Sequence, residues 1–289
     1  MTLTKSRKLF IWGALIAGTC SFGIGLIFFR GWSHQITPQP LAQSRQSPTL
    51  NSKSISPADS LNQDTPLKSP ITKDIIVSVP KQFEGTTIRE AKLSGQNKVI
   101  ALTFDDGPWP KNTEHVLNLL EQHNIKATFF WIGENVKNYP QIAQKVIAAG
   151  DVVGNHTWHH WYRPMNPATS ADEIDKTAAV IYQTTGVKTD LFRPPGGFLK
   201  NGLADYAKQH KYLVTMWSDD GPEFNRHATW QTMVKDVLDN AKPGGIVLMH
   251  DGGGPHYKTM EALPYIIDGL TKRGYRFVTV PEMLELQQK

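Results

Sequence analysis

Short apolar runs alternate with helix-like stretches from residue 99 to the end of this 289-residue chain. The strands that we expect cover residues 99–103, 127–131, 151–155, 191–192, 212–217, 246–249 and 277–280. Between them we expect helices over residues 112–123, 140–149, 203–209, 230–240 and 260–273, and one that opens at residue 170 with the Ser-x-x-Glu pattern of a capping box. Strands that alternate with helices are typical of parallel sheets, so the pattern predicts an α/β domain with a largely parallel sheet or barrel.

An uncharged segment, residues 9–29, precedes this domain. It is long enough to cross the ~30 Å hydrocarbon core of a bilayer as a helix. Three basic residues come before it and only Arg30 follows closely, so the positive-inside rule places the N-terminus in the cytoplasm and the rest of the chain outside. We therefore expect residues 1–30 to be a cytoplasmic stub and a single-pass signal-anchor in the cell membrane. A cleaved signal peptide, which would give a secreted form, is the alternative.

The region between this segment and the domain has a different composition. Residues 31–74 are rich in Ser, Pro, Gln, Thr and Asn, which predicts a disordered linker, and residues 75–98 are expected to be an N-terminal arm whose packing the sequence leaves open. Residues 1–98 carry 12 Lys or Arg and 5 Asp or Glu, whereas residues 99–289 carry 19 and 21. Because the basic excess lies outside the domain, we expect neither a nucleic-acid partner nor a nucleotide cofactor.

Two of the predicted strands end in residues that suit a metal ion. Asp105 and Asp106 follow the first strand; a solvated turn is one interpretation, and a base beside a cation ligand is the other. His156 and His160 lie just past another strand end, where one helical turn would bring both imidazoles to the same side. Two imidazole nitrogens and one carboxylate are a familiar catalytic zinc set, and His159 is the alternative second histidine.

Three further polar clusters also begin where a strand stops. Arg193 heads a Pro-Gly loop and is able to orient a carboxylate and keep it ionised. Residues 216–224 gather acids and aromatic side chains, and His250 ends the apolar run 246–249. The carboxyl ends of parallel strands meet at one edge, so these clusters predict a shared site there.

Taken in order, five segments resemble the five motifs of the polysaccharide deacetylases, the NodB-type domain of carbohydrate esterase family four. They are TFDDGP (103–108), HTWHH (156–160), RPPGG (193–197), WSDDGPEF (217–224) and LMH (248–250). The resemblance covers about residues 95–285. It implies a distorted (β/α) barrel with about seven strands, a divalent metal that is most often Zn²⁺, and hydrolysis of acetyl groups on a sugar polymer.

The resemblance also implies roles for individual residues. Asp105 resembles the catalytic base, Arg193 the arginine that tunes the base, and His250 the general acid. Asp106, His156 and His160 resemble the metal ligands. The residues expected to contact substrate are Pro195, Gly196, Trp217 and Leu248, with Leu248 as a wall of the acetyl pocket and the Gly196 N–H as a donor to the oxyanion.

Two motifs depart from the family pattern. Gly196 stands where an aromatic residue is usual, so a side-chain wall of the groove is expected to be missing. Glu223 and Phe224 stand where the family commonly has Asp-Trp. The family acid at this position tunes the general-acid histidine, so Glu223 is the first candidate for that role and Asp220 the second.

These features predict a membrane-anchored, metal-dependent hydrolase that acts outside the cytoplasm on an acetylated glycan polymer of the cell envelope. N-acetylglucosamine of peptidoglycan is the substrate that we expect first. Exopolysaccharide, chitin-like oligomers and acetylated xylan are alternatives within the same chemistry. An alternative from a different class is a catalytically idle glycan-binding domain, which the altered third and fourth motifs suggest.

Overall fold

The structure is a computed structural model that describes residues 74–93 and 97–287. The predicted membrane segment, residues 9–29, lies outside them, as does nearly all of the predicted linker. Within the described residues, none of the helices is both long enough and apolar enough to cross a membrane.

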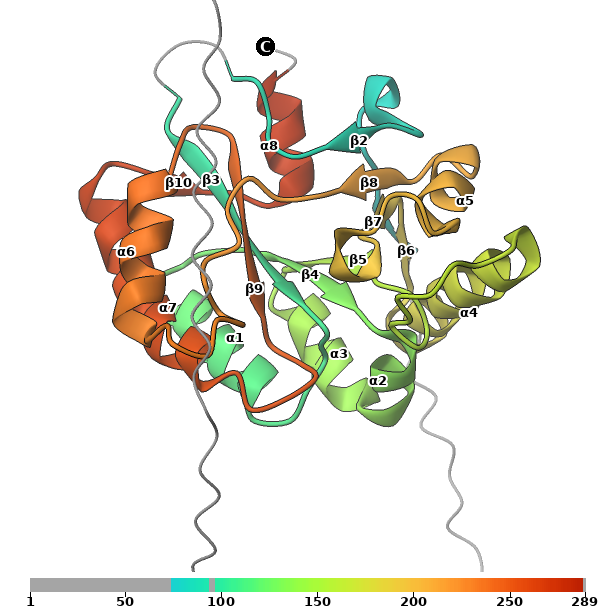
Figure 1. The fold of residues 1–289 in the computed structure, drawn as a ribbon, viewed down its shortest axis with the longest axis horizontal. Helices are drawn as coiled ribbons and strands as arrows, with labels where there is room; N and C mark the ends of the chain where they lie inside the picture. The colour runs from blue at the N-terminus through green and yellow to red at the C-terminus, as the bar shows by residue number, and fades with distance from the viewer. Residues whose placement is uncertain (1–73, 94–96, 288–289) are drawn as a thin grey trace, which may run out of the picture. The chain divides into compact units, whose positions relative to one another are not determined.

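A parallel sheet forms the centre of the domain (Figure 1). Its strands follow the order β10-β3-β4-β5-β7-β8-β2, and β9 also pairs with β3. Their bounds are β2 Thr87–Ile88, β3 Val99–Asp105, β4 Thr128–Trp131, β5 Val152–Asn155, β7 Leu191–Phe192, β8 Leu213–Thr215, β9 Gly245–His250 and β10 Arg276–Phe277. The predicted parallel α/β domain is confirmed, and the sheet curls as a half-barrel. An isolated bridge between Asp219, which follows β8, and Val247 of β9 links its two sides.

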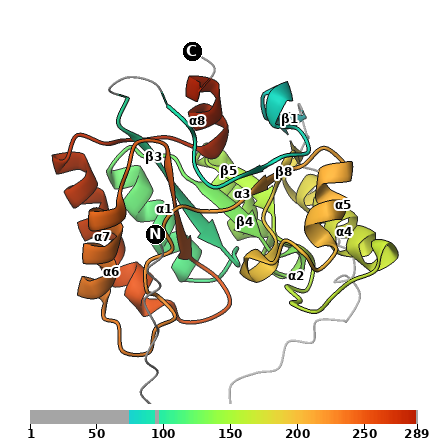
Figure 2. The ribbon, with the colours of Figure 1, turned by 45° about the horizontal axis from the view of Figure 1, so that its top comes forward.

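Helices lie around the sheet (Figures 1 and 2). They are α1 Asn112–Gln122, α2 Gly133–Asn138, α3 Pro140–Ala148, α4 Pro167–Thr185, α5 Leu203–Gln209, α6 Trp230–Asn240, α7 Tyr257–Lys272 and α8 Val280–Gln287, with short 3₁₀ turns η1 Lys81–Phe83 and η2 Pro195–Gly197. Helices α6 and α7 pack together on one side of the domain, and α4 and α5 pack together on the other.

The segment that was expected to form an arm packs on the domain: two strands of it pair with domain strands, and the Ala91 N–H donates to the Gly244 carbonyl at 2.8 Å. Strand β1 (Ile75–Val77) pairs in parallel with β6 (Val187–Thr189) as a small separate sheet. Strand β2 pairs in parallel with β8 and so extends the large sheet at its edge.

Strand β3 lies in the interior of the sheet and carries Asp105 at its end. All of its residues are buried, because β4, β9 and β10 pair with it and helices cover the sheet. The ring of Phe104 stacks on that of Phe129 from β4, with centroids 5.2 Å apart. The strand ends at Asp105, which the surrounding pairing therefore holds in a fixed position.

Three of the predicted element boundaries are wrong by three residues, and one of them is the start of α7, which begins at Tyr257 rather than at residue 260. Val280 was expected to close the last strand, but it begins α8, whose Met283 and Leu284 are buried with it. Helix α4 begins at Pro167 rather than at residue 170, because the side chain of Asn166 accepts the Thr169 N–H at 2.8 Å and caps the helix. The predicted capping box at residues 170–173 therefore lies inside the helix.

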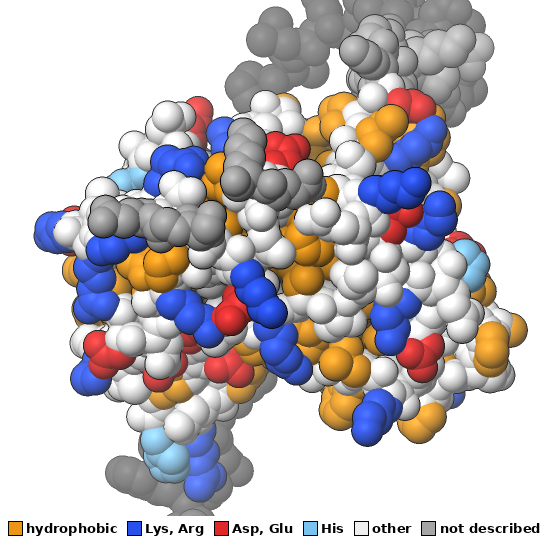
Figure 3. Space-filling model, turned by 90° about the horizontal axis from the view of Figure 1, so that it is seen from above, with side chains coloured by type: hydrophobic (Ala, Val, Ile, Leu, Met, Phe, Trp, Pro, Cys, Tyr) orange, Lys and Arg blue, Asp and Glu red, His pale blue; other side chains and the backbone are white. Residues whose placement is uncertain are grey.

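Charged side chains of both signs share the surface. On the face shown in Figure 3, Lys and Arg side chains are interspersed with Asp and Glu side chains. Some ion pairs are close, such as Lys145 to Glu114 and Lys188 to Asp74, each with a nitrogen–oxygen distance of 2.6 Å. Exposed pairs of this kind contribute at most about 1 kcal/mol each, so the stability of the domain rests mainly on its buried residues.

One buried carboxyl group makes the stability of the domain depend on pH. Burial raises the pKa of Asp151 to about 6, against the hydrogen bond that its Oδ1 accepts from the Ala127 N–H at 2.8 Å. The folded protein therefore binds more protons than the unfolded chain between about pH 4 and 6, and this contribution to stability is lost as the pH rises through that window. We expect Asp151→Asn to gain about 3 kcal/mol relative to the parent between pH 4 and pH 7.

Urea unfolding of parent and variant at a series of pH values measures this difference. Asp172→Asn, on the exposed face of α4, is the matched control and is expected to follow the parent. A constant difference between Asp151→Asn and the parent across this range would contradict the prediction.

Candidate active site

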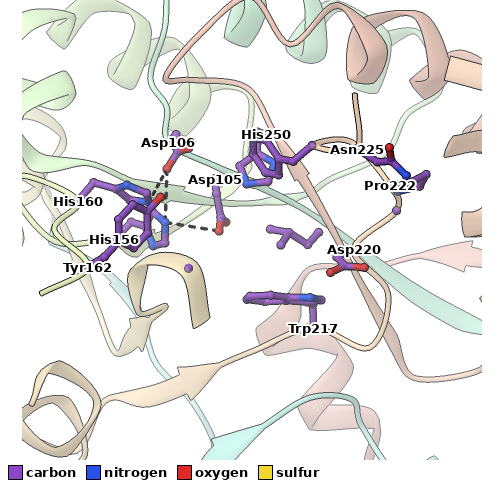
Figure 4. A pocket seen from close by; sticks show the side chains of 14 residues that line it. Asp105, Asp106, His156, His160, Tyr162, Trp217, Asp220, Pro222, Asn225 and His250 are labelled. Carbon is purple, nitrogen blue, oxygen red and sulfur yellow. Dashed lines mark ion pairs between the residues drawn. The ribbon is translucent and has the colours of Figure 1, made fainter. Parts of the chain in front are cut away.

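The five polar clusters converge at the carboxyl ends of the strands, as predicted, and surround a pocket of about 310 Å³. Its lining residues are Asp105, Asp106, His156, His160, Tyr162, Gly196, Trp217, Asp220, Gly221, Pro222, Phe224, Asn225, Leu248 and His250. Strand pairing sets the centre of the site, because Asp105 of β3 and His250 of β9 are register partners on adjacent strands. Figure 4 shows Asp105 between the histidine pair on one side and His250 on the other.

Asp106, His156 and His160 bring three potential ligand atoms together. Asp106 Oδ1 lies 3.4 Å from His156 Nε2 and 3.2 Å from His160 Nε2, and it is buried without a hydrogen-bond partner. His156 Nδ1 lies 2.7 Å from the Arg193 carbonyl oxygen, so Nδ1 carries the proton and Nε2 presents its lone pair. An orphaned carboxylate oxygen that faces two imidazole nitrogens fits a divalent cation such as Zn²⁺.

At neutral pH, Asp106 and His160 are in the protonation states that bind a metal ion. Burial would raise the pKa of Asp106, but the contacts and charges of His156 and His160 outweigh it and lower the pKa to about 2. Burial, with the neighbouring His156, lowers the pKa of His160 to about 4. At neutral pH the carboxylate is therefore ionised and the His160 imidazole is neutral, which are the forms that bind a metal.

A loop, rather than the predicted helical turn, brings His156 and His160 together. Residues 156–160 form a loop rather than a helical turn, and Thr157 and His160 have positive φ angles of 70° and 60°. The alternative ligand His159 faces away from the pair: its Nδ1 contacts Glu173, and its ring stacks on Trp161. The buried Glu173 also accepts the backbone N–H of Trp158 at 3.0 Å and so fixes the loop, a role that no pattern in the sequence indicates.

Arg193 lies behind Asp105 and is fully buried. Its Nη1 donates to Asp105 Oδ1 at 2.7 Å and to Thr103 Oγ1 at 2.9 Å, while its Nε donates to the Thr215 carbonyl at 2.9 Å. This leaves Asp105 Oδ2 toward the pocket, 3.6 Å from His156 Nε2. The arginine thus holds one carboxylate oxygen and leaves the other available for chemistry.

Glu223, rather than Asp220, reaches His250. Glu223 Oε2 lies 2.8 Å from His250 Nδ1, whereas Asp220 lies at the pocket mouth. Burial acts against charge on both groups, but their contact lowers the pKa of Glu223 to about 2 and, with Asp105 and Asp106, raises the pKa of His250. The contact with Glu223 therefore favours the protonated form of His250, although burial opposes it.

The walls of the pocket are aromatic and apolar. Leu248 and Trp217 line it as predicted, whereas Pro195, which was also expected to contact substrate, is buried and does not line it. The wall expected to be missing at Gly196 is present: a Cβ on this residue would lie 2.8 Å from the Tyr162 ring and 2.9 Å from the Phe198 ring. Gly196 has a φ of 59°, so the glycine allows both the turn and this close approach.

Comparison with known proteins agrees with this geometry. A family model described as "Polysaccharide deacetylase" matches residues 92–215. A peptidoglycan-N-acetylglucosamine deacetylase of Bacillus cereus is 37% identical over 205 residues, which are 71% of this chain and 96% of that protein.

Solved structures give the same result. A crystal structure of a peptidoglycan N-acetylglucosamine deacetylase is 32% identical, with a TM-score of 0.65 over 71% of this chain and 94% of that one. An acetyl xylan esterase from Clostridium thermocellum in complex with a cobalt ion is 34% identical, with a TM-score of 0.60 over 65% of this chain and 91% of that one. The chain therefore belongs to the polysaccharide deacetylases of carbohydrate esterase family four.

Proposed function

We propose that this protein removes N-acetyl groups from N-acetylglucosamine units of peptidoglycan, and that residues 9–29 anchor it with the catalytic domain on the outer side of the membrane. The observation that carries the chemistry is the position of Asp105 between the three ligand residues and His250. The choice of substrate is supported by the Bacillus cereus relative and by the solved deacetylase. The anchor is supported by the length and flanking charges of the segment.

The residues of the chain divide the reaction between them. A divalent cation such as Zn²⁺ held by Asp106, His156 and His160 supplies Lewis acidity and makes water more acidic. Asp105 Oδ2 accepts a proton from the water that attacks the acetyl carbonyl carbon, while Arg193 Nη1 donates to Oδ1 and so fixes the carboxylate. His250 then donates a proton to the nitrogen as the C–N bond breaks, which releases acetate and a free amine.

The pocket also fits the small group that is removed. Leu248 and Trp217 offer apolar surface beside the reacting residues, and the buried positions of Asp105 and His250 limit access of bulk water. We propose that Leu248 and Trp217 contact the acetyl methyl group. The sugar then lies against the aromatic side chains at the open end of the pocket. The same arrangement suits an O-acetyl group, so acetylated xylan is the competing substrate.

Acetate release by the full-length protein tests this proposal. We expect release from peptidoglycan and N-acetylglucosamine oligomers that chelation abolishes and added zinc restores, and that exceeds release from acetylated xylan. His156→Ala should lose both zinc and activity, because only two ligand residues remain. His123→Ala, at an exposed histidine after α1 that does not line the pocket, is the control and should keep both. A zinc-loaded protein that is inert on all three glycans, or one that prefers xylan, would contradict the proposed function, and recovery from the soluble fraction would contradict the anchor.

A further inference from the structure

A second histidine shares the carboxylate that holds the general acid. Glu223 Oε2 faces His250, and Glu223 Oε1 accepts the Nδ1–H of His256 at 2.8 Å and the hydroxyl of Thr259 at 2.6 Å. The two imidazole rings lie nearly parallel, with centroids 5.4 Å apart and an interplanar angle of 16°. Both carboxylate oxygens are therefore engaged, and His250 receives only one of them.

The backbone at His256 is also unusual. This residue precedes α7 with φ 28° and ψ 38°, a left-handed conformation that is uncommon for residues other than Gly, although His, Asn and Asp adopt it more often than the rest. Its side chain is 10% exposed and contacts the buried Glu223. A strained backbone that presents a buried imidazole to an ionised carboxylate indicates a defined task for the side chain.

The chemistry of Glu223 explains what that task is. A glutamate has three side-chain torsions, so one hydrogen bond to Oε2 leaves the carboxylate free to rotate away from His250. The donors at Oε1 remove this freedom. Lys258 Nζ adds a contact to the Glu223 backbone carbonyl at 2.9 Å, so the start of α7 holds the glutamate at both ends. The fixed carboxylate then keeps the proton on His250 Nδ1 and leaves Nε2 to face the pocket.

Resting on the proposed function, we propose that His256 is a positioning residue for the general acid. With Thr259 it fixes Glu223, which in turn binds the Nδ1–H of His250 and so fixes the ring orientation in which the Nε2–H of the protonated imidazole faces the departing amine.

Two acetyl substrates separate this role from a merely structural one. An amine leaves only after its nitrogen is protonated, whereas a nitrophenolate leaves without a proton. We expect His256→Ala to lower kcat on an N-acetylglucosamine tetramer by about 10- to 100-fold with little change in KM. Hydrolysis of 4-nitrophenyl acetate should change by less than about threefold, because the base and the ligand residues are untouched.

His256→Asn is the conservative variant. Its amide N–H lies near the position of the imidazole Nδ1–H, and Asn tolerates positive φ, so it should recover kcat to within a few-fold of the parent. Zinc content and melting temperature are measured for both variants, and activities are compared only if both quantities match those of the parent. Equal loss on both substrates, or failure of Asn to restore activity, would overturn the proposal. So would loss of a second bound zinc ion in His256→Ala, because Glu223, His250 and His256 would then be metal ligands.

A measurement without turnover keeps this test independent of the proposed function. NMR of ¹⁵N-histidine-labelled protein reports which nitrogen of His250 carries the proton. At a pH high enough for the ring to be neutral, we expect the Nδ1–H tautomer in the parent and in His256→Asn, and a mixture of tautomers in His256→Ala, because Glu223 no longer holds Nδ1–H. An unchanged His250 signal in His256→Ala would overturn the positioning role. Absence of glycan deacetylation with the expected spectra would refute only the proposed function.

Discussion

Replacing Asp105 with Asn is expected to lower kcat for deacetylation by about 10²- to 10⁴-fold, the range that general-base catalysis contributes. The amide has nearly the shape of the carboxylate, so its oxygen still accepts from Arg193, but its nitrogen offers no basic site at the position of Oδ2. The three ligand residues remain in place, so the variant should bind zinc.

Initial rates on N-acetylglucosamine oligomers, with zinc content measured on the same samples, check this expectation. Asp151→Asn is a matched control, because it makes the same change at another buried position, at the opposite end of β5 from the site. Its kcat should equal that of the parent. If Asp105→Asn keeps its zinc and turns over within threefold of the parent, another group is the base.

Removing the guanidinium of Arg193 should produce the largest loss of stability in the domain. Arg193→Met leaves the buried carboxylate of Asp105 without its ion pair and the Thr215 carbonyl without its donor. Breaking a buried pair by removing one partner typically costs about 3–5 kcal/mol in the free energy of unfolding. Activity should fall as well, because an unpaired buried carboxylate favours its protonated form.

A double-mutant cycle in urea unfolding isolates the charge. Asp105→Asn combined with Arg193→Met has no unpaired charge, so we expect the double variant to be more stable than Arg193→Met alone. Arg193→Lys keeps a charge but lacks the planar fork that contacts several partners, and it should lie between parent and Arg193→Met. Simple additivity of the two substitutions would show that the pair contributes no coupling energy.

The site could be located from the sequence because the apolar runs mark the strands and parallel strands place their carboxyl ends at one edge of the sheet. A buried parallel strand needs a continuous apolar run, and the residue after it must lie at the carboxyl edge, so Asp105, Asp106 and His156 were predicted near one another from pattern alone. The position of His250 follows from the same rule, since β9 pairs directly with β3.

Other features depend on side-chain packing between distant segments, which no local pattern encodes. His160 reaches Asp106 through two left-handed residues, a backbone path that the i, i+4 spacing does not reveal. Tyr162 and Phe198 come from different loops to cover Gly196. His256 follows a run of glycines that gives no periodicity, and its contact with Glu223 exists only because α7 packs beside the loop after β8.

The pairing of β3 with β9 separates two properties that enzymes often have to change together. The spacing of Asp105 and His250 is set by main-chain hydrogen bonds between adjacent strands, whereas the aromatic rim is borne by Tyr162, Trp217 and Phe198 on loops. Loop insertions or exchanges can therefore reshape the groove while the strand ladder preserves the reacting pair. In an evolving lineage, such a scaffold can pass from one acetylated polymer to another without first losing its chemistry.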